Sequence, residues 1–129
     1  MMPRHGVLII FLGLTLTATA CTPRQFYWGT YEDTLYTREQ QAGATGENEA
    51  ATTLAAIIDE ASAAGDLKVA PGIHADYGYL LFKQGKPDEA IAQLQQEATL
   101  YPESKVLMEK MVSRIQGLKD QRKEKKPTP

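Results

Sequence analysis

A single cysteine, Cys21, has the strongest potential for covalent chemistry in this chain of 129 residues. Without a second thiol it cannot form an intramolecular disulfide, so its position needs another explanation. The chain also contains two histidines, His5 and His74. Zinc sites combine several cysteine and histidine ligands, and this chain has only one cysteine and two histidines. The small number of such ligands argues against a metal centre. We therefore expect no metal and no cofactor, and we interpret His74 as a packing residue.

Acid–base catalysis would require carboxylates that converge from separate parts of the chain. The acidic pairs Glu32/Asp33 and Asp88/Glu89 are instead adjacent in sequence, near the expected starts of two helices. Negative charge is favoured at a helix N-terminus, so a role in stabilising these helices is the simpler interpretation. The sequence also lacks a glycine-rich phosphate loop and a serine-nucleophile motif. We predict no catalytic residues, no enzyme activity and no small-molecule substrate.

The N-terminal segment has the three parts of a secretory signal. Arg4 provides a positive start, and residues 6–16 form an apolar run. Small residues 17–20 follow, directly before Cys21. The apolar run is shorter than the roughly 20 residues that a membrane-spanning helix needs. We therefore predict a signal peptide over residues 1–20, removed on export.

The segment Ala18-Thr19-Ala20-Cys21 resembles the lipobox of bacterial lipoproteins. The resemblance implies that Cys21 is lipidated and that cleavage separates Ala20 from Cys21. Several acyl chains, palmitate among them, would then hold the protein firmly on the membrane. Thr22 takes the position where aspartate favours inner-membrane retention, which implies a periplasm-facing protein of the outer membrane. An ordinary signal peptide and inner-membrane retention remain as alternatives.

Residues 21–46 are expected to form a tether and an aromatic segment with a short helix over residues 31–41. Five of the ten aromatic residues of the chain lie between positions 26 and 36. Tyr and Trp are enriched at protein interfaces and at membrane surfaces. Packing on the helical domain is the simplest role for these rings, and docking of a partner or contact with the bilayer are the alternatives. The candidate partner-binding residues are Tyr27, Trp28, Tyr31 and Tyr36.

The rest of the chain shows helical periodicity and no strand-like alternation. We predict an all-α fold, with a helical domain over residues 47–119 and a charged, disordered tail over residues 120–129. Expected helices cover residues 47–64, the segments opened by Pro71 and Pro87, and residues 103–119. Thr30 is expected to cap the first helix through its hydroxyl. Gly65 and Gly85 are expected to end helices.

Residues 71–104 resemble one tetratricopeptide repeat (TPR), a hairpin of two antiparallel helices. Small residues stand where the two helices would approach closely, and larger apolar ones stand where the space between them must be filled. A proline closes the second helix. The positions that carry this pattern, and that we expect to pack the hairpin, are His74, Tyr77, Gly78, Leu81, Ala90, Leu94 and Pro102. The flanking helices would cover a single TPR-like hairpin on both sides.

The whole mature chain resembles the DUF4810 family of bacterial lipoproteins. The likeness rests on the segment Tyr27-Trp28-Gly29-Thr30-Tyr31, soon after Cys21, and on the single TPR-like hairpin near the C-terminus. It implies an accessory role in an outer-membrane assembly, with a curli-secretion-channel-like lipoprotein as partner. No chemistry is implied by this family.

Charge narrows the range of functions further. The formal net charge is −2, from 14 basic and 16 acidic residues, which gives no bulk attraction to nucleic acid. We therefore expect a non-enzymatic protein–protein interaction module. One alternative is a structural envelope lipoprotein that contacts peptidoglycan or lipopolysaccharide through its basic tail. Another is an accessory regulator of a cell-wall enzyme.

Overall fold

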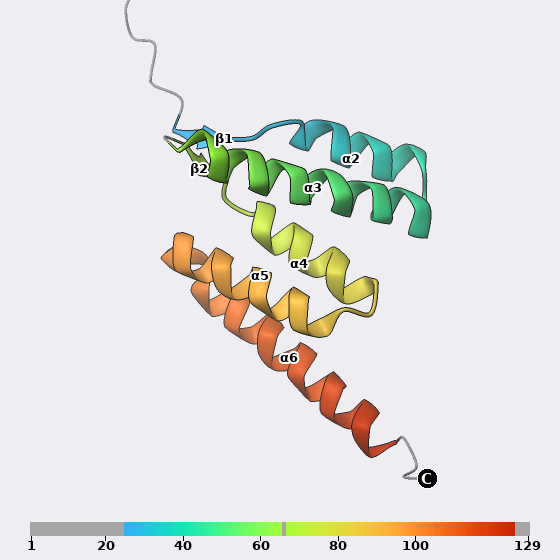
Figure 1. The fold of residues 1–129 in the computed structure, drawn as a ribbon. Coiled ribbons are helices and arrows are strands. Elements are labelled where there is room, and N and C mark those ends of the chain that lie inside the picture. The colour runs from blue at the N-terminus through green and yellow to red at the C-terminus, as the bar shows by residue number, and fades with distance from the viewer. Residues whose placement is uncertain (1–24, 66, 126–129) are drawn as a thin grey trace, which may run out of the picture.

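The computed structural model describes residues 25–65 and 67–125. The predicted signal peptide, its cleavage site after Ala20, the lipid-attachment residue Cys21 and the last four residues lie outside the described part. The described residues form five α-helices and two short strands. Figure 1 shows the helices stacked in chain order, with the small pair of strands at one end. The all-α prediction is confirmed. None of the described helices is long and apolar enough to cross a membrane.

The first hairpin consists of α2 (Tyr31–Gln40) and α3 (Ala44–Ala64). Alanine is the strongest helix former, which accounts for the length of the alanine-rich α3. Buried residues recur on α3 at the three- and four-residue spacing of one helix face, at Ala50, Leu54, Ile57 and Ala61. Gly65 follows α3 with a φ of +69°, in the left-handed region that favours glycine, and ends the helix there.

The second hairpin is formed by α4 (Ile73–Lys83) and α5 (Pro87–Leu100) and corresponds to the TPR-like segment. Pro87 occupies the first turn of α5, where its missing N–H costs no hydrogen bond. Gly78 allows the close approach of the two helices. A Cβ at this position would lie 3.0 Å from the carbonyl oxygen of Ala90 and 3.2 Å from Cγ of Leu94.

The chain ends in a short 3₁₀ turn, η1 (Pro102–Ser104), and the long helix α6 (Lys105–Glu124). We predicted that the disordered tail would begin at Asp120, and this boundary is wrong because α6 continues to Glu124. Arg122 and Lys123 lie in the last turn, where cations interact favourably with the helix dipole. Charge therefore supports this end of α6, where we had interpreted it as a sign of disorder.

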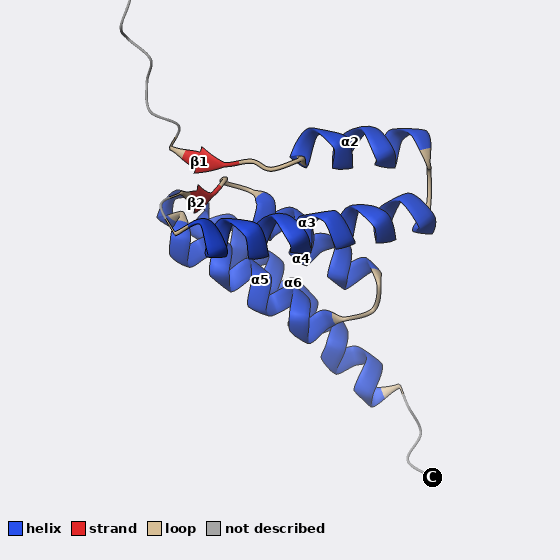
Figure 2. Cartoon of the chain, turned by 45° about the horizontal axis from the view of Figure 1, so that its top comes forward, coloured by secondary structure: helices blue, strands red, loops and turns tan. Residues whose placement is uncertain are grey.

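Two short strands, β1 (Phe26–Tyr27) and β2 (Lys68–Val69), pair in parallel, which the sequence did not predict. Phe26 is paired with Lys68 and Tyr27 with Val69. Strands of two residues are too short to show an alternating pattern. Figure 2 shows this pair at one end of the helical stack, next to the point where the described chain begins. It fixes the aromatic segment to the loop between α3 and α4.

The core is divided into two clusters by α4. Ile73 and Leu80 of α4 join the cluster formed with α3, whereas Leu81 joins the cluster formed with α5 and α6. Tyr77 is half-buried and packs against both clusters. Full burial of a leucine or isoleucine side chain contributes about 1.5–3 kcal/mol. The central helix therefore joins the N-terminal hairpin to the C-terminal helices.

Candidate functional site

Alternate helices of the stack contribute side chains to one candidate interaction surface. We call it the α2–α4–α6 face and define it by eight residues of these three helices: Tyr31, Arg38, Asp76, Tyr79, Lys83, Met111, Arg114 and Leu118. Side chains of α2 reach α4 by polar contacts. Side chains of α4 and α6 together line a partly apolar groove. The two halves of the face therefore differ in chemistry.

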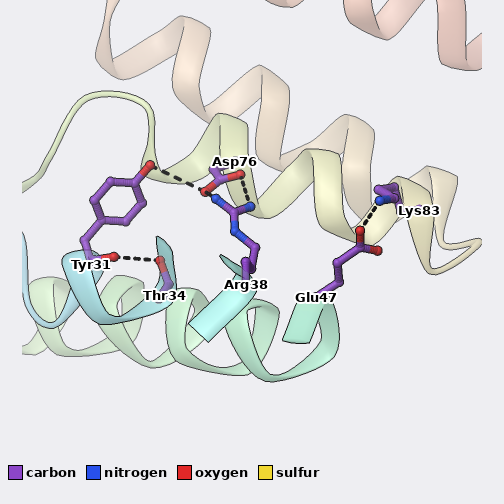
Figure 3. A network of polar contacts seen from close by, with 6 residues as sticks. All are labelled: Tyr31, Thr34, Arg38, Glu47, Asp76 and Lys83. Carbon is purple, nitrogen blue, oxygen red and sulfur yellow. Dashed lines mark hydrogen bonds and ion pairs between the residues drawn. The ribbon is translucent and has the colours of Figure 1, made fainter. Parts of the chain in front are cut away.

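A two-bonded ion pair joins α2 to α4. Nη1 of Arg38 lies 2.9 Å from Oδ1 of Asp76, and Nη2 lies 3.0 Å from Oδ2. Figure 3 shows both side chains extended towards each other, with the Tyr31 hydroxyl aimed at the same carboxylate from 3.5 Å. Burial and the nearby Asp76 raise the pKa of Tyr31 above its usual value. This planar fork geometry fixes the direction of both side chains.

A second polar link lies near the other end of α4. Lys83 bonds Glu47 at the start of α3, and the hydrogen bond to Glu47 raises the pKa of Lys83. The Lys83 ammonium also lies 5.8 Å from the centre of the Tyr79 ring, within cation–π range. Gln84 donates to the Asn48 side chain at 2.9 Å. The polar half of the face is thus largely committed to holding the two hairpins together.

The four candidate partner-binding aromatic residues do not form one patch. Tyr27 lies in β1 and donates from its hydroxyl to Glu60 at 2.6 Å, and Tyr31 is half-buried in the ion-pair network. Trp28 is 42% exposed, and its ring centre lies 5.9 Å from that of Tyr31. Tyr36 is 67% exposed. Trp28 and Tyr36 therefore remain available for contact, whereas Tyr27 and Tyr31 take part in the fold.

The turn between the aromatic residues depends on Gly29. Its φ of +51° is unfavourable for residues with a Cβ, and a Cβ there would come within 2.8 Å of Cγ1 of Ile57.

We expected the Thr30 hydroxyl to cap α2, and this is wrong. Thr30 has φ −99° and ψ 33°, outside the extended conformation that capping side chains need, and only its carbonyl accepts, from the Asp33 N–H at 3.0 Å.

The hairpin residues predicted from the TPR pattern lie mainly between α4 and α5. Gly78, Leu81, Ala90 and Leu94 are buried. His74 is buried too, and its Nδ1 lies 2.7 Å from Oε1 of Gln93. Tyr77 is half-buried, and burial raises the pKa of its hydroxyl. Pro102, in contrast, is exposed at the start of η1.

A hollow with a volume of about 500 Å³ lies beside this hairpin. Its described lining includes His74 and Gln93 together with Lys68 and apolar residues such as Ile58 and Leu100. No carboxylate and no thiol is among those described lining residues. Within residues 25–65 and 67–125, no three His, Cys, Asp or Glu side chains come close enough to hold a metal ion.

One buried carboxylate, Glu97, was missed in the sequence. It is 2% exposed, and its Oε1 accepts a hydrogen bond of 2.7 Å from the Gly72 N–H at the start of α4. Its Oε2 has no hydrogen-bond partner among the described residues. A carboxylate at a helix N-terminus is stabilised by the helix dipole. A glutamate three residues after Leu94, on the apolar inner side of α5, was the available signal.

The apolar half of the face is the groove between α4 and α6. Tyr79 and Phe82 of α4 line it with Met111, Arg114, Ile115 and Leu118 of α6. Tyr79 and Leu118 are large side chains that remain 46% and 38% exposed. The helical periodicity predicted a last helix over residues 103–119, but it did not predict this groove. The surplus apolar residues at the α4 side of this helix could have indicated a groove.

These features define a small all-α protein built from stacked helical hairpins, with a partly apolar groove beside its last helix. The chain belongs to the DUF4810 family. The sequence profile of this family, described as a domain of unknown function, matches residues 25–111. The match runs from β1 into the first half of α6. No curated protein and no solved structure matches the chain.

Proposed function

We propose that this protein is a lipid-anchored, periplasm-facing accessory protein of the bacterial outer membrane. In this role it binds another envelope protein and supports an assembly without catalysing a reaction. Anchoring rests on Cys21, which lies four residues before the first described residue, Gln25. A fully extended chain of that length spans at most about 14 Å. The end of the stack that carries β1 would therefore stay close to the bilayer.

One observation carries the interaction role. The α2–α4–α6 face leaves apolar side chains exposed on both sides of the α4–α6 groove. The cation Arg114 lines the same groove without a carboxylate partner among the described residues. Apolar surface with aromatic residues and arginine is typical of the centre of a protein interface. A curli-secretion-channel-like lipoprotein is the partner that the sequence resemblance favours.

The anchor is tested first, by mass spectrometry of the protein purified from native membranes. We expect a mature chain that begins at Cys21 and carries covalent acyl chains. A Cys21→Ala variant should be recovered without acyl chains and without firm membrane association. A mature chain that begins elsewhere, or an unmodified Cys21 in the wild type, would contradict the lipoprotein proposal.

The interaction is tested by short-range crosslinking in membranes of the native host, followed by purification through a C-terminal tag. We expect one envelope protein to be recovered in a stoichiometric complex, and expect Cys21→Ala to reduce its yield strongly. Tyr36→Ala and Thr52→Ala serve as a matched pair of surface variants. Both residues are exposed, Tyr36 on α2 and Thr52 on α3. Recovery of peptidoglycan or lipopolysaccharide alone would instead favour a structural envelope lipoprotein.

A further inference from the structure

The α4–α6 groove continues beyond the face described above. A second hollow shares Phe82, Ile115 and Leu118 with the first and extends it towards the end of α6. The two hollows have volumes of about 150 and 250 Å³. Ile115 lies at the base, only 5% exposed, whereas Leu118 remains open to solvent. The groove therefore has an apolar floor along the second half of α6.

Every charged residue that lines these two hollows is basic: Arg114, Lys119, Arg122 and Lys123. Lys119 bonds Asp88 at the start of α5. No salt bridge joins the other three to a carboxylate in the described part of the chain. Cations without partners around an apolar floor favour a ligand that carries negative charge beside apolar groups.

The acidic residues of this part of α6 lie elsewhere. Consecutive residues are about 100° apart around an α-helix, so Asp120 and Glu124 lie opposite Leu118 and Arg122. Asp120 and Glu124 are exposed to solvent. Between Arg114 and Glu124, the cations of α6 therefore line the groove, and the anions lie away from it. This separation concentrates positive potential where the apolar surface is open.

We propose that the groove binds an acidic amphipathic helix of the partner protein. The groove follows α6 from Met111 to Arg122, a distance of about 16 Å at 1.5 Å per residue. That length accommodates about three turns of a partner helix, with apolar residues spaced three and four apart on the floor and carboxylates against the cations. The floor is recessed between two helices, so a flat bilayer surface would not reach Ile115. This inference rests on the proposed interaction function and names its site and the chemistry of the partner.

The test places a photo-crosslinking amino acid at Leu118 of the full-length protein in its native host. Asp120, two residues away on the opposite side of α6, is the matched control position. We expect crosslinking from position 118, at least tenfold more than from 120, and mass spectrometry should identify the attached segment as acidic and amphipathic. Attachment to lipid or lipopolysaccharide, attachment to a neutral or basic segment, or equal yields at both positions would overturn the proposal.

Charge is tested separately with the double variant Arg114→Glu/Arg122→Glu, both exposed positions. We expect crosslinking from Leu118 to fall at least tenfold, while Asp120→Lys, which leaves the groove unchanged, should have little effect. Circular dichroism checks that both variants remain folded. Unchanged crosslinking in the folded double variant would refute the acidic nature of the ligand.

A further position separates this inference from the broader function. If a crosslinker at Trp28 or Tyr36 captures an envelope protein and one at Leu118 captures none, the groove proposal fails and the interaction role stands. If none of the three positions captures a protein, both proposals fail.

Discussion

Arg38 and Asp76 join the first and third helices of the described chain through two parallel hydrogen bonds of 2.9 and 3.0 Å. Their side chains are only 23% and 17% exposed, so water screens this pair less than it screens the other ion pairs of the surface. The two residues are 38 positions apart in sequence. The pair therefore contributes to the position of α2 and of the exposed Trp28 and Tyr36 that flank or lie on it.

The first prediction concerns this pair. Arg38→Ala should lower the free energy of unfolding by about 1–3 kcal/mol, because it leaves a half-buried carboxylate with only the long contact to Tyr31. Urea unfolding followed by circular dichroism measures the change. Arg38→Lys keeps the charge but loses the fork, so it should cost less than Arg38→Ala. A double-mutant cycle with Asp76→Asn should give coupling of about 1 kcal/mol or more, and coupling near zero would contradict this account.

The second prediction uses two helical glycines as a matched pair. Gly78→Ala should destabilise the protein by about 1–3 kcal/mol, because the new methyl group would press on the backbone of Ala90 and on Leu94. Gly117→Ala lies in α6 with nothing within 4 Å of the new Cβ, so it should stabilise the protein by about 0.8–1 kcal/mol. Thermal unfolding of the two variants should therefore shift in opposite directions. Equal shifts would contradict the close approach of α4 and α5.

These residues show which contacts can be predicted from the sequence and which cannot. The TPR pattern predicted that the small residues Gly78 and Ala90 lie where two helices approach closely. Helix–helix contact restricts residue size at such positions, and this restriction leaves a recognisable pattern in the local sequence. The partners Arg38 and Asp76 left none, since either residue alone looks like an ordinary surface charge. Their meeting depends on the angle at which α2 crosses the rest of the stack, and spacing along one helix does not encode that angle.

The same limit explains the missed strands and the misplaced tail. The pairing of Phe26 with Lys68 is set by tertiary packing rather than by a local propensity. Residues 120–124 looked disordered from composition, yet they continue α6, whose apolar residues Ile115 and Leu118 are already held near α4. The groove was missed for a related reason, because periodicity gives the apolar side of a helix but not how much of it a neighbour covers.

The third prediction concerns Glu97. Glu97→Ala should lower the free energy of unfolding by about 1–3 kcal/mol, because the Gly72 N–H at the start of α4 loses its acceptor and a buried space opens. Glu97→Gln keeps an acceptor oxygen of the same reach and should cost less. Urea unfolding of both variants makes the comparison. If glutamine were as damaging as alanine, the hydrogen bond to Gly72 would not be the reason for this buried residue.

The last prediction concerns the pH dependence of stability. Burial, and to a lesser degree Glu97 and Glu103, raise the pKa of Tyr101 above its usual value of 10.0. The unfolded chain therefore loses the phenol proton first as pH rises, so this contribution to stability is complete below about pH 10 and declines above it. The hydroxyl also donates to the Val69 carbonyl within the core.

Tyr101→Phe should lower the free energy of unfolding by about 1 kcal/mol at pH 8 and should reduce the loss of stability between pH 8 and pH 10.5. Tyr31 and Tyr77, whose pKa values are also raised by burial, should account for part of the remaining loss. Urea unfolding at both pH values gives the comparison, and an identical pH dependence in wild type and Tyr101→Phe would rule out a contribution from this phenol.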